Sequence, residues 1–309
     1  MMDSGHGFSK TLSAITIDVE DGVNILMKDH FNISMPPTER VVSNVDVLLN
    51  LLAKHLTQAT FFILGEIADV FPELVRKIDN AGHEIGVHGY NHNQLYKLTA
   101  EKAADDILRA KKVLEDLIGK PVSGYRAPAF SISPETSWAL KVIAESGFKY
   151  DSSIMPVKMK RYGWKGFEKD IVRLSFPDST SLIEVPLPVI DLLGMNSPAC
   201  GGGYLRYFPL SFTQWAFSSI VKYRPVVVYL HPYELDTTRY PNHFYSARKT
   251  LSVKKSIPLM MYRFKKGTVR GKLDSILNKY KFTTLGNIIE LREQENVIRS
   301  IKLSKYLGS

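Results

Sequence analysis

The sequence predicts an α/β fold, in which a parallel sheet is covered by helices and closed or nearly closed into a barrel. Strand-length apolar segments alternate with amphipathic helical segments along the chain, the order expected of repeated βα units. Several strand segments are apolar at almost every position, as strands buried on both faces are. A length of 309 residues fits one large α/β domain or two small ones.

The expected elements follow one another in a regular order. Residues 13–19 form the first strand, and a helix with one apolar face begins shortly after Pro36 and Pro37. Further strands are expected at 59–65, 84–88, 122–127, 148–153 and 225–232, with a β-hairpin formed by 170–176 and 181–188. Further helices are expected at 72–82, at 99–119 with Thr99 as its N-cap, and at 134–147.

The composition is that of a soluble globular protein, with 44% hydrophobic and 23% charged residues. The longest apolar runs, such as PVVVYL at 225–230, are far shorter than the ~20 residues that span a bilayer. The N-terminal residues lack the pattern of a secretory signal, and the single cysteine, Cys200, fits a reducing compartment. We therefore expect a cytoplasmic protein.

The net charge of +9 is concentrated near the C-terminus, where residues 247–309 hold 15 Lys and Arg against 4 Asp and Glu. We expect a barrel domain over 10–246 and a basic extension over 247–309, whose apolar stretches pack on the barrel. The extension is either a solvated appendage or a surface for anionic partners such as phospholipid headgroups. It contains no recognised nucleic-acid-binding motif. Its outer face is expected to present Lys254, Lys255, Lys265, Lys266 and Arg270.

Chemically active side chains follow the expected strands, and in such barrels the C-terminal strand ends meet at one rim. His88 ends the strand at 84–88, and His92 lies four residues further on. On a helix, residues i and i+4 share one face, so both imidazoles could reach a single ion. The other strand ends contribute carboxylates, a guanidinium and a third imidazole, from Asp18, Glu20, Asp21, Arg126, Asp151 and His231.

Five segments, in this order, resemble the motifs of the polysaccharide deacetylases, the type of carbohydrate esterase family four with a NodB homology domain. They are TIDVEDG, HGYNH, YRAPAFSIS, YDSSIMP and YLHPYE, and the resemblance spans roughly residues 10 to 235. The segment GGGYLR at 201–206 also resembles the branch that acts in bacterial surface polysaccharide biosynthesis. The resemblance implies a distorted (β/α) barrel of seven or so parallel strands.

The resemblance also implies a role for each residue at the rim. One divalent metal ion, most simply Zn²⁺, would be held by His88, His92 and a carboxylate. Asp18 would be the base that takes a proton from the attacking water, and His231 the acid that protonates the leaving amine. Three further residues would assist: Arg126 by holding Asp18, Asp151 by orienting His231 or tuning its pKa, and Ala129 by donating its backbone N–H to the developing oxyanion.

The chain departs from the family pattern at three places. The family has two adjacent aspartates, whereas here Asp18 is followed by Val19, Glu20 and Asp21. Residues two apart on a strand face the same side, which favours Glu20 as the metal ligand, and Asp21 remains open if the strand has already ended. Gly89 replaces a frequent Ser or Thr, and Ala129 replaces a frequent aromatic residue.

The expected substrate contacts come from three further residues. Leu230 is expected to wall the pocket for the acyl methyl group, and Trp164, in a glycine-flanked loop, to stack on a sugar ring. Tyr204 is expected to bind substrate if the GGGYLR segment is a substrate loop, the alternative being a plain turn.

These observations predict an N-deacylase that acts on an acylated amino sugar, which would be nucleotide-linked, lipid-linked or part of an oligosaccharide. Contact with an anionic membrane surface at the inner membrane is also expected. Two alternatives stay open: a metal-dependent hydrolase of a non-sugar linear or cyclic amide, and a non-catalytic carbohydrate-binding barrel. The joint presence of Asp18, both histidines and His231 argues against the second.

Overall fold

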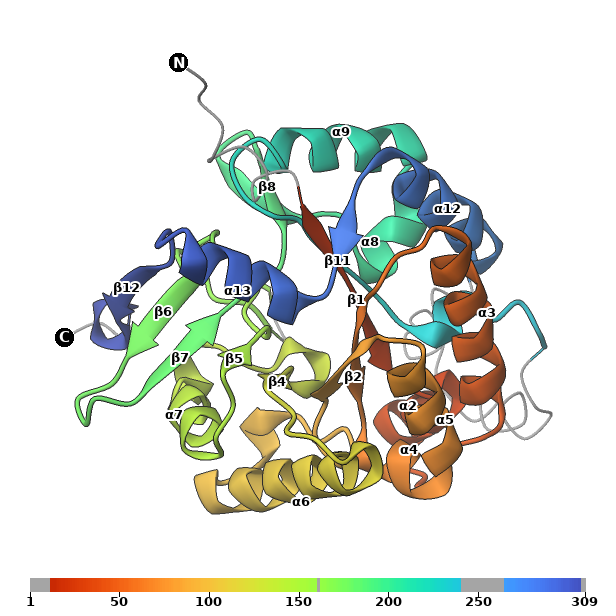
Figure 1. The fold of residues 1–309 in the computed structure, drawn as a ribbon, viewed down its shortest axis with the longest axis horizontal. Helices are drawn as coiled ribbons and strands as arrows, with labels where there is room; N and C mark the ends of the chain where they lie inside the picture. Colours follow the sequence, from red (N-terminus) through yellow and green to blue (C-terminus); the bar gives the residue numbers. More distant parts are fainter. Residues whose placement is uncertain (1–11, 160–161, 240–263, 307–309) are drawn as a thin grey trace.

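The computed structural model describes residues 12–159, 162–239 and 264–306 (Figure 1). Its main sheet has the order β10-β1-β2-β3-β4-β5-β7-β6-β12. Neighbours are parallel from β10 to β7, whereas β6 is antiparallel to β7. The strands from β10 to β7 in this order are β10 (Val227–Leu230), β1 (Ser13–Val19), β2 (Thr60–Ile63), β3 (Glu84–Val87), β4 (Gly124–Tyr125), β5 (Tyr150–Asp151) and β7 (Ser181–Glu184).

These seven strands form a distorted, nearly closed barrel, which confirms the expected fold class. Within the described chain β7 and β10 are not paired with each other, so the ring stays open between them. Apolar side chains from both sides line this gap, among them Ile171, Val185, Val227 and Ile288. The expected hairpin of β6 (Val172–Ser175) and β7 is confirmed as well.

Helices cover the outer side of the strands, as Figure 1 shows for α3 to α7 around β1 to β5. The periodic apolar residues of α3, from Val41 to Leu52, are buried as predicted, and Thr99 caps α6 through a bond from the Lys102 N–H. The helices in chain order are α2 (Gly22–Phe31), α3 (Arg40–Lys54), α4 (Gly65–Val70), α5 (Pro72–Asn80), α6 (Ala100–Ile118), α7 (Trp138–Glu145), α8 (Gly202–Tyr207), α9 (Leu210–Ile220), α12 (Val269–Lys279) and α13 (Leu285–Gln294).

Strand alternation divides the core into two clusters. Along β10, Val228 and Leu230 belong to the cluster between the sheet and the helices, whereas Val227 and Tyr229 belong to the cluster inside the barrel. Leu285, Ile288 and Ile289 of α13 also belong to the inner cluster, so this helix fills part of the barrel.

The described part of the C-terminal segment joins the same sheet. β11 (Phe282–Thr283) pairs with β1, and β12 (Arg299–Lys302) pairs with β6. The expected boundary at residue 246, together with Lys254 and Lys255, lies outside the described residues and stays a prediction. Lys265 and Arg270 are exposed, but the expectation for Lys266 is wrong: its side chain is buried, and its ammonium lies over the ring of Tyr233.

Between the hairpin and β10 the sequence pattern predicts no strand or helix. This region contains a second hairpin, β8 (Val189–Leu192) with β9 (Met195–Pro198), followed by α8 and α9. GGGYLR is therefore mostly the helix α8 and neither a plain turn nor an open loop. Among the described helices, none combines the length and the apolar character that crossing a membrane requires.

Candidate metal centre and active site

Three buried side chains converge just beyond the C-terminal ends of β1 and β3. The Oε1 atom of Glu20 lies 3.1 Å from Nε2 of His88 and 3.1 Å from Nε2 of His92. Among the described residues, these three form the group of carboxylate and imidazole donors whose atoms lie close enough together to bind one ion. One carboxylate oxygen and two imidazole nitrogens are a ligand set that suits zinc and leaves coordination positions open.

The two histidines are brought together by a loop, so the helical spacing considered from the sequence is not what unites them. The loop turns at two left-handed residues, Gly89 with φ 74° and His92 with φ 54°. Asp106 of α6 holds the loop by accepting the Tyr90 N–H at 2.7 Å and an Asn93 amide N–H at 3.1 Å. A Cβ on Gly89 would lie 3.0 Å from Asp106 Oδ2, which accounts for glycine at this position.

The tautomer of His88 supports a metal at this point. Its Nδ1 lies 2.8 Å from the carbonyl oxygen of Arg126, so Nδ1 must carry a proton. When Nδ1 carries the only proton of the ring, Nε2 and the Glu20 carboxylate face each other 3.1 Å apart as two acceptors, and either a second proton or a cation must lie between them. A cation between them removes this conflict, and the backbone carbonyl is the usual kind of partner for the second nitrogen of a metal-binding histidine.

Asp21, the alternative ligand, is engaged in other contacts and lies outside this cluster. Its Oδ1 caps α2 by accepting the backbone N–H of Val23 at 2.8 Å. Its Oδ2 accepts both the N–H and the hydroxyl of Thr38 at 2.5 Å. The strand ends at Val19, and the carboxylate of Asp21 is used to start the next helix. Glu20 is therefore the carboxylate that the structure brings to the histidines.

Asp18 is held by Arg126 at the same rim. Both side chains are almost fully buried, and Nη1 of Arg126 lies 2.8 Å from Oδ1 of Asp18. Arg126 also donates to the hydroxyl of Thr16 at 2.7 Å and to two oxygens of Ser152, at 2.8 and 2.9 Å. Its guanidinium packs on the ring of Phe62. This is the contact expected from the sequence, and it leaves Oδ2 of Asp18 directed at the site.

His231 faces Asp18 and Glu20 from the end of β10. Its Nε2 lies 3.8 Å from Oδ2 of Asp18 and 3.9 Å from Oε1 of Glu20. Burial works to lower the pKa of His231, but the negative charges of Glu20, Glu234 and Asp18 raise it to about 9. For Glu20 the effects run the other way: burial would raise its pKa, and the histidines hold it well below its usual value.

The expectation that Asp151 contacts His231 is wrong. The carboxylate of Asp151 instead accepts the hydroxyl of Ser153 at 2.5 Å and lies next to the carboxyl group of Glu184 of β7. Both carboxyl groups are fully buried, so at least one of them is kept neutral. Burial and the neighbouring charge of Asp151 raise the pKa of Glu184 well above its usual value. The residue that contacts Nδ1 of His231 is Glu234, at 3.4 Å.

The backbone at Ala129 has an unusual conformation, which bears on its expected role as a hydrogen-bond donor through its N–H. Ala129 and Phe130 both have left-handed φ values, 53° and 51°. Such conformations cost of order 1–3 kcal/mol each in non-glycine residues and gather at functional sites. Along the described chain, no backbone carbonyl and no side chain accepts the N–H of Ala129. The expectation that this N–H serves an oxyanion is compatible with its geometry.

Aromatic side chains form the apolar wall of the site. Tyr229, buried inside the barrel, makes edge-on contacts with the rings of His231 and Phe130. Tyr204 donates or accepts a hydrogen bond with Tyr162 at 3.0 Å, and both lie close to Tyr229. Leu230 is wrong as the wall of the acyl pocket, because it lies on the other face of β10, toward the helices. Strand alternation gives that position to Tyr229.

Trp164 is wrong as a stacking platform for sugar. Its side chain is only 2% exposed and packs against Phe167 and Tyr306. Gly163 shapes the turn that buries this side chain: its φ is 103°, and a Cβ there would lie 2.6 Å from the carbonyl oxygen of Val157. The signal from the sequence, an aromatic residue between glycines, is the same for a buried anchor and an exposed platform.

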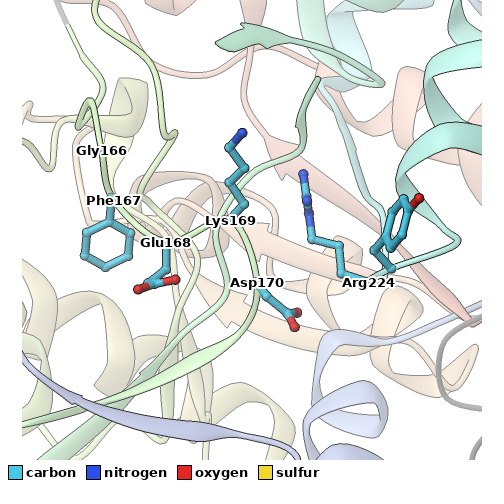
Figure 2. A pocket seen from close by; sticks show the side chains of 7 residues that line it. Gly166, Phe167, Glu168, Lys169, Asp170 and Arg224 are labelled. Carbon is cyan, nitrogen blue, oxygen red and sulfur yellow. The ribbon is translucent and has the colours of Figure 1, made fainter. Parts of the chain in front are cut away.

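Two of the hollows formed by the described residues are large and lie outside the metal centre. One, of about 630 Å³, is lined by Tyr162, whose ring contacts that of Phe130, and by Tyr96, Val157, Lys158 and Lys165. The other, of about 420 Å³, is lined by residues 166–170, Tyr223 and Arg224. Figure 2 shows its two cationic groups, from Lys169 and Arg224, pointing away from the carboxylates of Glu168 and Asp170. None of the residues expected from the sequence lines this second hollow.

The fold and the site together define a class, a nearly closed α/β barrel with a cluster of one carboxylate and two imidazoles at its C-terminal rim. Residues 29–150 match the family model described as polysaccharide deacetylase. Residues 152–290 match a second model, described as a domain of unknown function (DUF3473). The similarity to the polysaccharide deacetylase family thus lies in residues 29–150.

Two curated relatives are similar over the N-terminal part. A peptidoglycan deacetylase of Helicobacter pylori is 38% identical over 35% of this chain and 36% of its own length. A peptidoglycan-N-acetylglucosamine deacetylase of Bacillus cereus is 33% identical over 44% of this chain and 48% of its own. The chain thus matches less than half the length of either relative.

Solved structures show the same fold over nearly the whole chain. A candidate polysaccharide deacetylase from Mycobacterium smegmatis has a TM-score of 0.64 at 22% identity, covering 95% of this chain and 94% of that one. The allantoinase PuuE has a TM-score of 0.60 at 15% identity, covering 94% and 93%. At these identities the likeness concerns the fold.

Proposed function

We propose that the protein is a metal-dependent hydrolase that removes an acetyl or similar acyl group from the nitrogen of an amino sugar. The observation that carries the proposal is the meeting of three functions at one buried point. Glu20, His88 and His92 form a metal-binding set, Asp18 lies beside it on Arg126, and His231 closes the opposite side. The curated relatives, named as peptidoglycan deacetylases, support the same chemistry.

A divalent ion held by Glu20, His88 and His92 would supply Lewis acidity toward the acyl carbonyl and lower the pKa of water. Asp18, held in place by Arg126, accepts a proton from the attacking water as the water oxygen bonds to the carbonyl carbon. The N–H of Ala129 donates to the carbonyl oxygen as negative charge develops there. His231 donates a proton from Nε2 to the sugar nitrogen as the C–N bond breaks, giving a carboxylate and a free amine.

The shape of the site supports a sugar substrate. Tyr229 contacts the ring of His231, Tyr204 and Tyr162 share a hydrogen bond, and Tyr162 also lines the hollow of about 630 Å³. Such a hollow has room for saccharide units beyond the one that carries the acyl group. We propose more narrowly an intermediate of O-antigen, capsule or exopolysaccharide biosynthesis, and this narrower assignment rests on the resemblance of the GGGYLR segment.

The experiment is to measure acyl release by the zinc-loaded protein from a panel of substrates. The panel contains N-acetyl and N-formyl amino sugars as monomers, oligomers and nucleotide-linked forms, and cyclic amides such as allantoin. The account predicts release of acetate or formate from at least one sugar and none from the cyclic amides. Turnover of cyclic amides alone would move the protein to the non-sugar alternative, and no turnover at all would favour a non-catalytic carbohydrate-binding barrel.

Asp18→Asn supplies the matched variant for this panel. It should keep the metal and lose hydrolysis by about 10² or more, the usual scale for removal of a general base. Glu73→Gln changes an exposed carboxylate in the same chemical way and should hydrolyse like the wild type. Equal loss in both variants would contradict the role given to Asp18.

We further propose a cytoplasmic location with contact at the inner membrane surface. Cys200 is a buried free thiol, which suits a reducing compartment, and Lys265 and Arg270 of the basic extension are exposed. Each basic residue near an acidic membrane contributes about 1 kcal/mol, and salt screens the attraction. Co-sedimentation with phosphatidylserine vesicles should fall at high salt and on changing both residues to Glu. Lys112→Glu on α6, also exposed, is the control, and binding that ignores lipid charge would refute this contact.

A further inference from the structure

Glu234 lies three residues after His231, in the short helix η4 (Pro232–Glu234), and its carboxylate is buried. Its Oε2 accepts the backbone N–H of His231 at 3.1 Å and lies 3.4 Å from Nδ1 of the same residue. Its Oε1 lies 3.0 Å from Nε of Arg206. One buried carboxylate thus joins His231 to a buried guanidinium.

These contacts orient the imidazole of His231. With Nδ1 directed at Glu234, the opposite nitrogen, Nε2, is directed at Asp18 and Glu20. The ring of Tyr233 stacks on the imidazole at 4.8 Å and 19°, which hinders rotation of the ring. A carboxylate that accepts the N–H of one ring nitrogen fixes the orientation of the ring, and with it which nitrogen points toward a substrate.

Arg206 explains the segment GGGYLR, which the proposed mechanism leaves without a role. Gly201 and Gly202 let α8 begin directly on the ring of Tyr229, where a Cβ would approach to 2.2 and 2.5 Å. The helix then carries Arg206, which is 5% exposed, to the carboxylate of Glu234. A buried carboxylate needs such a counter-charge, because an unpaired one is strongly destabilising.

Asp151, to which the resemblance gives the orienting role, is engaged elsewhere. Its carboxylate accepts the hydroxyl of Ser153 and lies next to Glu184, on the side of the site occupied by Arg126. The contacts therefore give the two carboxylates different roles. Asp151 supports the segment next to Arg126, and Glu234 contacts His231.

We propose that Glu234 is the positioning residue for His231 and that Arg206 holds Glu234 in place. This inference rests on the proposed function, because His231 is the acid only if an amine leaves. A purely structural role is the specific alternative, since a carboxylate that accepts the His231 N–H also caps the short helix after β10. The two roles differ in what they predict for the leaving group.

The experiment compares one amide and one ester in the full-length, zinc-loaded protein. An ester such as 4-nitrophenyl acetate has a leaving group that needs no proton, whereas the sugar amine does. Glu234→Gln keeps an oxygen for the backbone N–H but loses the charge at Nδ1. We expect kcat for the amide to fall by about 10², with little change in KM, and kcat for the ester to change by less than about threefold. His231→Gln should show the same selectivity, and Glu73→Gln none.

Two results would overturn the proposal. Equal losses on amide and ester in Glu234→Gln would reduce Glu234 to a cap. A selective amide loss in Asp151→Asn, with none in Glu234→Gln, would return the orienting role to Asp151. Arg206→Gln should shift the ratio of amide to ester rates in the same direction as Glu234→Gln.

Long-range ¹H–¹⁵N spectra of the wild-type protein supply a test that needs no Glu234 variant to fold. We expect the Nδ1 proton of His231, assigned by its loss in His231→Gln, to resonate downfield as in a charge-assisted hydrogen bond. An Nδ1 without a proton would contradict the proposal. If the wild type releases acyl groups from no sugar, the proposed function fails, whereas these spectra still decide whether Glu234 holds the Nδ1 proton of His231.

Discussion

The buried pair of Arg126 and Asp18 gives the sharpest energetic prediction, because almost no water reaches either side chain. Arg126→Met keeps most of the packing on Phe62 but leaves the Asp18 carboxylate without its charged partner. It also removes the donors to Thr16 and Ser152. Breaking a buried pair from one side costs about 3–5 kcal/mol of unfolding free energy. Asp18→Asn keeps an oxygen for Arg126 and should cost less, about 1–3 kcal/mol.

The assay is urea unfolding of the wild type, both single variants and the double variant. Because the amide introduced by Asp18→Asn is neutral and needs no counter-charge, the double variant should recover about 1–3 kcal/mol relative to the sum of the single losses. The exposed pair Arg76 and Glu73 is the matched control, and Arg76→Met with Glu73→Gln should show a coupling below about 1 kcal/mol. Additive losses at Arg126 and Asp18, within about 0.5 kcal/mol, would refute the claim that the two charges depend on each other.

Three further predictions follow from single contacts. Because burial and Asp151 raise the pKa of Glu184 above 4.5, the stability that its proton contributes is present at acid pH and lost as the pH rises through the folded-state value. The free energy of unfolding of Glu184→Gln should therefore rise relative to that of the wild type as the pH increases, by up to about 1.4 kcal/mol per pH unit. Denaturation curves at several pH values measure this difference, and a difference that does not change with pH would contradict the prediction. Gly89→Ala should cost about 1–2 kcal/mol and weaken zinc binding through the contact with Asp106, whereas Gly119→Ala, left-handed but in open space, should cost stability without changing zinc affinity in a titration. Trp164→Ala should cost about 3–5 kcal/mol in thermal unfolding without raising KM for the sugar, in contrast to Trp215→Ala on the surface; a raised KM would restore Trp164 as a substrate contact.

The barrel could be predicted from the sequence because each half-buried or fully buried strand carries its own periodicity. Segments such as SAITIDV and PVVVYL are apolar where the structure buries them, and Thr99 and Gly119 mark the ends of α6. The small strands β11 and β12 carry too few residues for a periodic signal, and their pairing with β1 and β6 depends on tertiary contacts.

The candidate site was only partly accessible from the sequence. Strand ends correctly grouped Asp18, Glu20 and both histidines, since parallel strands of a barrel end at one rim. The face of a strand is a finer property: one position separates Leu230, toward the helices, from Tyr229, inside the barrel. The spacing of Glu234 three residues after His231, with proline between, was a capping signal that could have been noticed.

The partners of buried charges were the least predictable feature. Arg206 reaches Glu234 from α8, and Asp106 reaches the histidine loop from α6, across distances in sequence that no local pattern encodes. Asp151 illustrates the reverse case, a motif residue whose partner in the fold is Glu184 of β7. Motif order identifies the members of a site, whereas their pairing is set by the packing of the helices and loops around it.

Zinc titration of the chelator-stripped protein, with acetate release from an N-acetyl amino sugar as the readout, tests the central claim most directly. If Glu20, His88 and His92 hold the ion on which hydrolysis depends, activity should rise from near zero and break at about one equivalent of zinc per chain. The variant with both histidines changed to Ala should stay inactive at every zinc concentration while remaining folded. Acetate release by the stripped protein, or a titration without a break at one equivalent, would contradict the account.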